Sequence, residues 1–179
     1  MANGLRISIG LAALVVIVLA QSVPPGIGKG WLPEFDHAAT QINALAAATP
    51  ADKFTWRPAP GVRSVSEVYM HIAVGNYFIL SQAGLKPPPE IAARLKPDSE
   101  RSVTSKADVI QWLKDSQDFV RTSYPKIDRK KKVNFLGNDT DADGVLLRLL
   151  VHNHEHMGQS IAYARMVGVV PPWSAAPGR

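Results

Sequence analysis

The sequence predicts an all-α protein built as a four-helix bundle, and three observations lead to this prediction. Four segments place apolar residues at helical spacing, whereas no segment offers a persuasive strand-like alternation of polar and apolar residues. Loops that contain proline and glycine separate these segments. The connections are long, which fits a bundle that contains crossovers. The 179 residues suffice for one domain with its own core.

The four predicted helices have recognisable starts. Pro33 suits a first helical turn, and Ser64 with Glu67 fits a capping box, in which each side chain satisfies a backbone N–H of the other residue. Ser105 is a candidate cap of the third helix, and acidic residues from Asp141 onward favour the positive end of the fourth. The helices are expected over about 33–48, 65–82, 106–123 and 141–167.

The connections are expected to be loops. A run of prolines at 87–89 cannot be helical, and a short helical turn near 91–95 interrupts the long connection that contains it. The tail over 169–173 is expected to be extended. The loop before the fourth helix carries a run of basic residues, namely Lys126, Arg129, Lys130, Lys131 and Lys132. We interpret this run as part of a solvent-exposed loop.

The charge pattern gives no support to a nucleic-acid partner. The formal net charge is +5, from 20 Lys and Arg against 15 Asp and Glu. No aromatic residues interleave with the basic run, as a platform for stacking single-stranded bases would require. The chain has no cysteine, which excludes disulfides, cysteine-ligated zinc and a thiol nucleophile supplied by the protein.

The first 20 residues have the layout of a signal peptide. Arg6 precedes an apolar run that ends at Ala20, where short side chains suit a cleavage site. The sequence therefore predicts an exported protein, periplasmic or extracellular, without stable membrane contact once the leader is removed. The alternative is an uncleaved anchor, since the apolar run could stretch to a tilted span. The expected organisation is leader 1–20, linker 21–30, bundle 31–174 and tail 175–179.

Two histidines interrupt the apolar face of the fourth predicted helix. His152 and His156 lie four residues apart, so their side chains share one helix face. They fall on the stripe of Val145, Leu149 and Tyr163, which should turn inward. Buried imidazoles need partners, and one metal ion would serve both, although polar side chains of neighbouring helices could do so too.

A third histidine, His71, lies in the second predicted helix and can reach this pair only through packing of the bundle. Three neutral imidazoles that leave positions open form a common catalytic or binding arrangement around a metal. By contrast, His154 projects to a different face and makes a poor ligand, and His37 is interpreted as structural. The spacing is not HExxH, so the metalloprotease motif does not apply.

Together these motifs resemble those of the DinB-like superfamily. The resemblance rests on the three histidines, on Met157-Gly158-Gln159 after the last of them, on Trp56-Arg57-Pro58 and on Gly168 to Pro172, and it covers roughly 31–174. It implies an up-up-down-down four-helix bundle and a divalent ion, nickel or zinc, bound by His71, His152 and His156 with water completing the shell. It also implies that the chain could form a homodimer.

Three functions remain open. The first is a metal-dependent hydrolase acting on a small molecule, with Glu155 or Glu67 as candidate base and Tyr163 either lining the pocket or packing in the core. The second is a metal-dependent thiol S-transferase or isomerase, as some members of the family are, although an export signal would separate the protein from cytosolic thiols. The third is a non-catalytic module that the metal stabilises.

Overall fold

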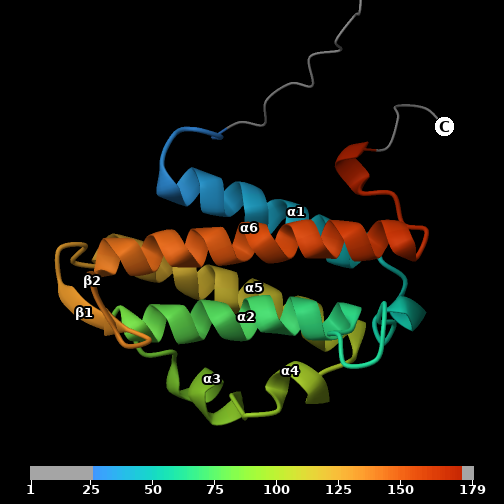
Figure 1. Cartoon of the computed structure of the whole chain (residues 1–179), viewed down its shortest axis with the longest axis horizontal. Helices are drawn as coiled ribbons and strands as arrows, with labels where there is room; N and C mark the ends of the chain where they lie inside the picture. The colour runs from blue at the N-terminus through green and yellow to red at the C-terminus, as the bar shows by residue number, and fades with distance from the viewer. Residues whose placement is uncertain (1–25, 175–179) are drawn as a thin grey trace, which may run out of the picture.

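The structure is a computed structural model that describes residues 26–174, and the predicted leader 1–20 and tail 175–179 lie outside the described residues. Four long helices form a bundle, which confirms the predicted fold class (Figure 1). Two of them coincide with the predicted ranges, and the other two begin or end within two residues of them. The long helices are α1 Trp31–Ala48, α2 Val65–Gln82, α5 Lys106–Ser123 and α6 Ala142–Met166.

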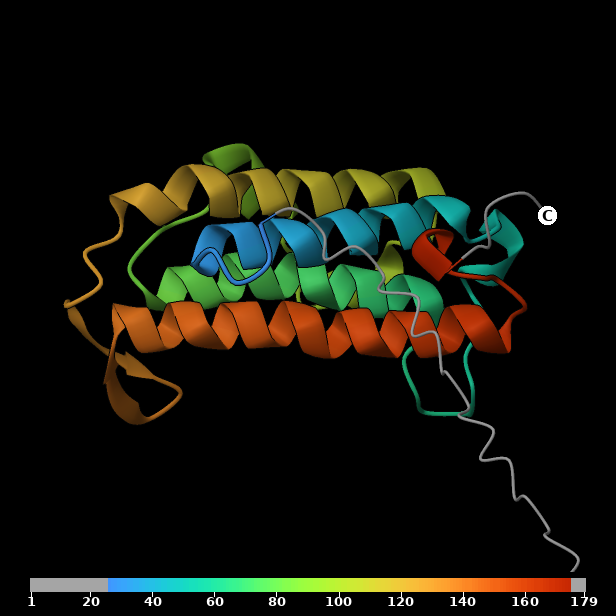
Figure 2. The ribbon, with the colours of Figure 1, turned by 90° about the horizontal axis from the view of Figure 1, so that it is seen from above.

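Contacts between helix ends fix the directions of the helices. Lys106 at the start of α5 donates to the carbonyl oxygen of Ala47, 2.7 Å away, so α1 and α5 are antiparallel. The indole of Trp31 at the start of α1 donates to the carbonyl of Leu146 near the start of α6, so these two are parallel. With α2 antiparallel to α6, the directions in chain order are up, down, down, up (Figures 1 and 2).

This order differs from the up-up-down-down order that the resemblance implied. The single crossover lies between α2 and α5, where the chain over 83–105 returns along the whole bundle. Two short helices interrupt it, α3 Pro89–Arg94 near the predicted turn and α4 Ser99–Ser102, which was not predicted. The expectation that no residue of 87–89 is helical was wrong for Pro89, which begins α3, because the first turn of a helix does not need the N–H that proline lacks. The connection over 49–64 instead folds back at the end of α1, because the backbone N–H of Ser66 bonds to the carbonyl of Phe54.

The sequence interpretation missed a β-hairpin in the basic loop. Strands β1 Lys132–Phe135 and β2 Asn138–Asp141 pair antiparallel, and Leu136 and Gly137 turn between them with positive φ angles of 52° and 88°. Both positive angles are what a tight two-residue hairpin turn needs. The pattern was hidden because the strands are short, carry Asn and Asp, which strands disfavour, and lack the usual Asn-Gly turn signal. The predicted extended tail also ends in a 3₁₀ turn, Pro172–Ser174.

The expected helix caps are present. Ser64 Oγ accepts the backbone N–H of Glu67 at 3.3 Å, and the Glu67 carboxylate accepts that of Ser64 at 2.8 Å, which is the predicted capping box. Asp141 accepts the N–H of Gly144 at 3.0 Å at the start of α6. These bonds satisfy backbone donors that helix starts leave unpaired, and they hold the first turns of α2 and α6 in place.

The core consists of two apolar clusters, one toward each end of the bundle. One contains Phe54, Tyr69 and Trp112, and the other contains Phe35 and Leu149. Helix α2 contributes heavily to both and lies between α5 and α6, so almost all of its surface is covered.

A buried polar chain lies between the two clusters. Asn76 on α2 donates to Ser116 Oγ on α5 at 3.1 Å and accepts from Asn153 Nδ2 on α6 at 2.8 Å. All three side chains are fully buried. Hydrogen bonds are directional, and a buried polar group without a partner is unfavourable. These buried hydrogen bonds therefore fix the axial register of α2 relative to α5 and α6.

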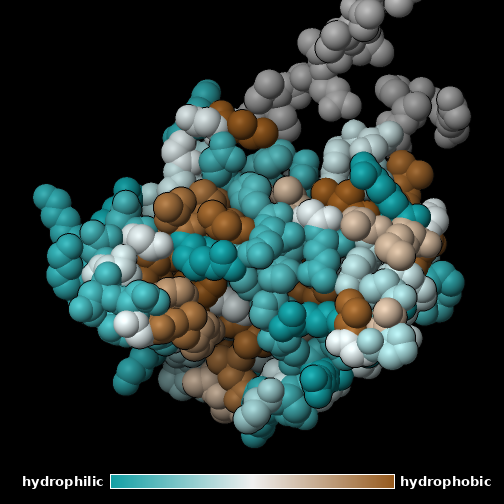
Figure 3. Space-filling model, viewed as in Figure 1, coloured by the Kyte–Doolittle hydropathy of each residue, from teal (hydrophilic) through white to brown (hydrophobic). Residues whose placement is uncertain are grey.

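The solvent-facing side of α6 carries both apolar and charged residues. Leu147 and Val151 are exposed there, beside the ion pair of Arg148 with Glu155 at 2.8 Å. Figure 3 accordingly shows separate hydrophobic patches among hydrophilic surface on this side of the molecule. Among residues 26–174, no helix combines the length and the apolar character needed to span a membrane.

Replacement of Asn76 by alanine tests the buried polar chain. The variant leaves Ser116 and Asn153 each without one partner inside the core, so we expect it to lower the free energy of unfolding by about 2 kcal/mol. Urea denaturation measures this change. Gln111→Ala is the control, because it removes an exposed hydrogen bond on α5 and should change stability by less than about 0.5 kcal/mol. Equal stability of Asn76→Ala and Gln111→Ala would contradict the assignment.

Candidate metal centre

The three histidines singled out from the sequence lie together in the structure. His71 comes from α2, while His152 and His156 come from successive turns of α6. One nitrogen of each ring can be chosen so that all three lie within 4.8 Å of one another. Two antiparallel helices thus bring together side chains that are far apart in the sequence, as the metal hypothesis required.

The distances suit a small divalent ion. Nε2 of His71 and Nε2 of His152 are 3.1 Å apart, and the three ring centroids are separated by 4.9, 4.6 and 4.6 Å. Two nitrogens bound tetrahedrally to zinc at about 2.0–2.1 Å lie roughly 3.3–3.4 Å from each other. Small side-chain movements would therefore bring the rings into coordinating positions.

Gly75 makes room for the central ring. A Cβ atom at this position would clash with Cε1 of His152 and would lie 3.1 Å from both of its ring nitrogens. Glycine is unfavourable within a helix by about 1 kcal/mol relative to alanine. Its presence inside α2 is therefore explained by the close approach of the imidazole, which lies against the backbone of that helix.

His71 is oriented by a carboxylate from the crossover. Its Nδ1 lies 2.7 Å from Oε1 of Glu100, on the short helix α4, and the other oxygen of Glu100 accepts from Arg63 Nε at 3.1 Å. A carboxylate that accepts from Nδ1–H leaves Nε2 as the free, electron-rich nitrogen of the ring. This is the usual support of a metal-binding histidine.

His156 is oriented in a similar way from its own helix. Its Nδ1 lies 2.8 Å from Oε1 of Gln159, whose amide donates to the hydroxyl of Tyr163 at 3.0 Å. An amide oxygen accepts only, so Nδ1 carries the proton and Nε2 is left free. Tyr163 packs edge-on against Trp56 in the core and at the same time anchors this hydrogen-bond chain.

The environment of His152 and His156 favours their neutral form. Burial, together with the neighbouring His156 and His71, lowers the pKa of His152 from its usual 6.5 to about 3. Burial also lowers the pKa of His156 despite the opposing effect of its hydrogen bond to Gln159. Nδ1 of His152 is buried without a hydrogen-bond partner among the described residues. Neutral imidazoles are the form that binds metal, so the chemistry of the donor set fits a divalent ion.

Glu100 remains ionised beside them. Burial acts to raise its pKa, but the hydrogen bonds from His71 and Arg63 outweigh burial and hold the pKa below its usual value. The carboxylate is thus a negative charge next to the cluster, where it would partly balance a bound cation.

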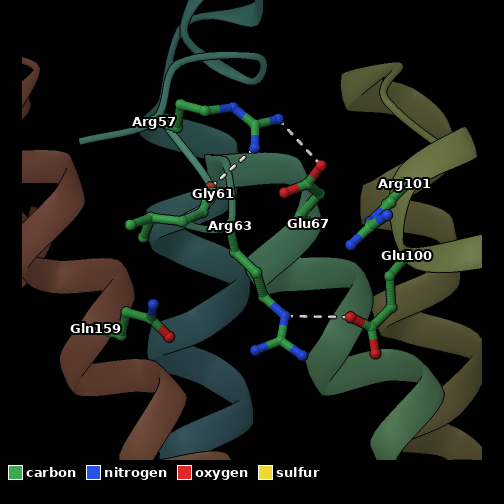
Figure 4. A pocket seen from close by; sticks show the side chains of 8 residues that line it. Arg57, Gly61, Arg63, Glu67, Glu100, Arg101 and Gln159 are labelled. Carbon is green, nitrogen blue, oxygen red and sulfur yellow. Dashed lines mark hydrogen bonds and ion pairs between the residues drawn. The ribbon is translucent and has the colours of Figure 1, made fainter. Parts of the chain in front are cut away.

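A cleft of about 730 Å³ opens next to the cluster (Figure 4). Glu100 and Gln159, which hold two of the histidines, both line it. The loop before α2 supplies its other side, including Arg57 and Arg63. The volume suits a small organic molecule, so a substrate in this cleft would lie beside the histidines.

The structure separates the other candidates from this site. His154 points away and bonds through Nδ1 to the carbonyl of Leu150 at 3.0 Å, as its different helix face predicted. Glu155 is exposed and paired with Arg148, and it is not among the clustered residues. Glu67 lines the cleft, but both of its oxygens are engaged. His37 is not part of the cluster.

The sequence interpretation missed Gly75, Arg63 and Glu100. Gly75 carried a signal, since a glycine inside an otherwise apolar helix, one turn after His71, suggests close packing. Glu100 and Arg63 carried none, because each lies in a connection and meets the site only through the path of the crossover.

Comparisons with known proteins agree with this fold. The sequence matches the family model described as the DinB superfamily over residues 34–160. No curated protein matches it. A DinB-like protein from Bacillus cereus ATCC 10987 has a similar structure, with a TM-score of 0.69 and 20% identity over 80% of this chain and 95% of that one.

Two Bacillus subtilis proteins also share the fold. The DinB-like protein YjoA has a TM-score of 0.61 and 13% identity, over 82% of this chain and 99% of that one. YfiT has a TM-score of 0.60 and 12% identity, over 84% of this chain and 93% of that one. YfiT is described as a probable metal-dependent hydrolase with an unusual four-helix bundle topology.

Gly75→Ala tests the close approach of His152. Alanine should favour the helix by itself, yet its Cβ must displace the ring, so we expect a protein that binds divalent metal at least tenfold more weakly and is less stable. Calorimetric zinc titration measures this change. Gly158→Ala is the matched control, because a Cβ there meets nothing within 4 Å. It should retain metal affinity and gain up to about 1 kcal/mol of stability. Unchanged metal affinity in Gly75→Ala would count against His152 as a ligand.

Proposed function

This chain belongs to the DinB superfamily, and we propose that it is a metal-dependent hydrolase whose divalent ion is bound by His71, His152 and His156. The observation that carries the proposal is the convergence of three imidazoles beside an open cleft. The description of YfiT, a protein of the same fold, as a probable metal-dependent hydrolase supports the reaction type.

The donor set favours nickel or zinc. Imidazole nitrogen is a ligand of intermediate softness that suits zinc and nickel better than the magnesium or calcium that carboxylate-rich sites select. Glu100 is bonded to Nδ1 of His71 and to Arg63, so it supports a ligand rather than competing as one. Three protein ligands leave coordination positions for water and substrate, which is typical of catalytic sites.

The residues around the ion have separate tasks. Glu100 and Gln159 hold the protons of His71 and His156 on Nδ1, so the Nε2 atoms face the ion. When bound, the ion would polarise a carbonyl group and lower the pKa of a water molecule to about 7. The cleft would hold the substrate against that position.

The two alternative functions are separable by experiment. A thiol S-transferase would require a thiol co-substrate, so turnover would depend on an added low-molecular-weight thiol. A non-catalytic module would bind the ion but turn over no substrate. The cleft that adjoins the histidines favours catalysis, because structural metal sites are commonly closed by a fourth protein ligand.

Metal content tests the site. Protein purified without a histidine tag should contain about one divalent ion per chain by elemental analysis. Each of His71→Ala, His152→Ala and His156→Ala should lose most of it, since every variant removes one of three ligands. His154→Ala is the matched control, because this residue lies between the two proposed ligands on α6, but its side chain is hydrogen-bonded to the carbonyl of Leu150. Equal metal content in all four variants would defeat the assignment.

Chelation tests the link between the ion and the fold. A ligand that binds only the folded state stabilises it by about 4 kcal/mol when present at 1,000 times its dissociation constant. Removing the ion should therefore lower the melting temperature by roughly 10 °C, measured by calorimetry before and after chelation. Zinc or nickel should restore both the melting temperature and ester or amide hydrolysis. A melting temperature that chelation leaves unchanged in a metal-containing sample would contradict the proposal.

A further inference from the structure

The cleft beside the histidines is lined by charged residues from three separate parts of the chain. The loop before α2 contributes Arg57 and Arg63, α2 contributes Glu67, and the short helix α4 contributes Glu100 and Arg101. Figure 4 shows these side chains converging on the same space.

One of the arginines is used up in holding the fold. Arg57 donates from Nη1 to the carbonyl of Val62 at 2.8 Å and from Nη2 to Glu67 at 3.0 Å. The other oxygen of Glu67 accepts the backbone N–H of Ser64 in the capping box. The charges of Arg57 and Glu67 therefore compensate each other, and both side chains already have hydrogen-bond partners within the protein.

The other two arginines retain donors. Arg63 uses only Nε, toward Glu100, so both of its terminal amino groups are unused within residues 26–174. Arg101 is exposed, and its guanidinium has neither a hydrogen bond nor an ion pair with any other described residue. In Figure 4 its guanidinium points toward the space between the two glutamates and the loop. Both free donor groups thus face the cleft.

The charge balance at this place is positive. Arg57 pairs with Glu67 and Arg63 pairs with Glu100, which leaves Arg101 uncompensated. Histidine ligands carry no negative charge, so a divalent ion bound by the three histidines would add its positive charge to the same region. A cleft with unpaired guanidinium donors next to such an ion attracts anions and repels cations.

We propose that this cleft binds the anionic group of the substrate, a carboxylate or a phosphate, through Arg101 and the terminal amino groups of Arg63. The planar guanidinium fork matches both oxyanions and binds them through paired, charge-assisted hydrogen bonds. The substrate class is then a small organic acid or phosphate ester whose charged end lies in the cleft while its reacting bond lies at the histidines. This inference rests on the proposed function for the reacting bond, whereas the arginines are in place without the ion.

The test compares Arg101→Gln with the wild-type full-length chain. Succinate is titrated calorimetrically into zinc-loaded and into metal-free protein, and inorganic phosphate is titrated separately to distinguish the two kinds of anion. Succinamide, which has the same length but no charge, is the control ligand. Arg165→Gln is the control variant, because it removes one exposed positive charge from α6 outside the residues that line the cleft.

We expect succinate, phosphate or both to bind the wild type, with succinamide at least tenfold weaker. Arg101→Gln should weaken anion binding roughly tenfold in the zinc-loaded and the metal-free protein alike, while Arg165→Gln leaves it unchanged. Arg101 makes no side-chain contact that the fold needs, so circular dichroism of the variant should match the wild type.

The proposal is overturned if neither anion binds, or if Arg101→Gln and Arg165→Gln bind the anion equally well. It is also overturned if succinamide binds as tightly as succinate. Failure of the wild type to take up zinc would count against the proposed function alone, because anion binding to the metal-free protein is measured independently.

Discussion

The candidate site depends on the close, registered contact between α2 and α6. His71 and His152 can approach to 3.1 Å only because Gly75 lets the imidazole of His152 lie against the backbone of α2. The adjacent residues, Asn76 and Asn153, bond to each other across the same interface at 2.8 Å. A shift of either helix by one turn would break this buried bond and separate the imidazoles, so one contact secures both the packing and the site.

The long helices and the connection between α2 and α5 contribute to the site in different ways. The three histidines lie on two long helices, where packing against the apolar clusters fixes their positions. Glu100, which fixes the proton of His71, comes from the crossover between α2 and α5. The same crossover supplies one wall of the cleft. The long connection, which looks from its composition like a simple loop, therefore completes the site.

The charges of the cleft follow from the same arrangement. Glu100 bonds to a histidine on one side and to Arg63 on the other, so it links the cluster to the loop before α2. A negative carboxylate between a guanidinium and an imidazole ring holds both in place without neutralising the rest of the cleft. The histidines, the supporting carboxylate and the arginines of the cleft thus form a continuous path from the core to the surface.

The sequence by itself determined the four long helices and the identity of the three histidines. Helical periodicity and capping residues act locally, which is why α2 and α5 were predicted to the residue and why His152 and His156 were assigned to one inward face. The hairpin at 132–141 escaped because its strands are short and polar and gain their order from packing against the bundle. Only the tertiary structure decided the directions of the helices, the approach of His71 to the pair and the parts played by Glu100, Arg63 and Arg101. These features depend on the path of residues 83–105 across the bundle and on the register of α2 against α6. Contacts between residues far apart in the chain determine both. The spacing of neighbouring residues therefore does not predict them.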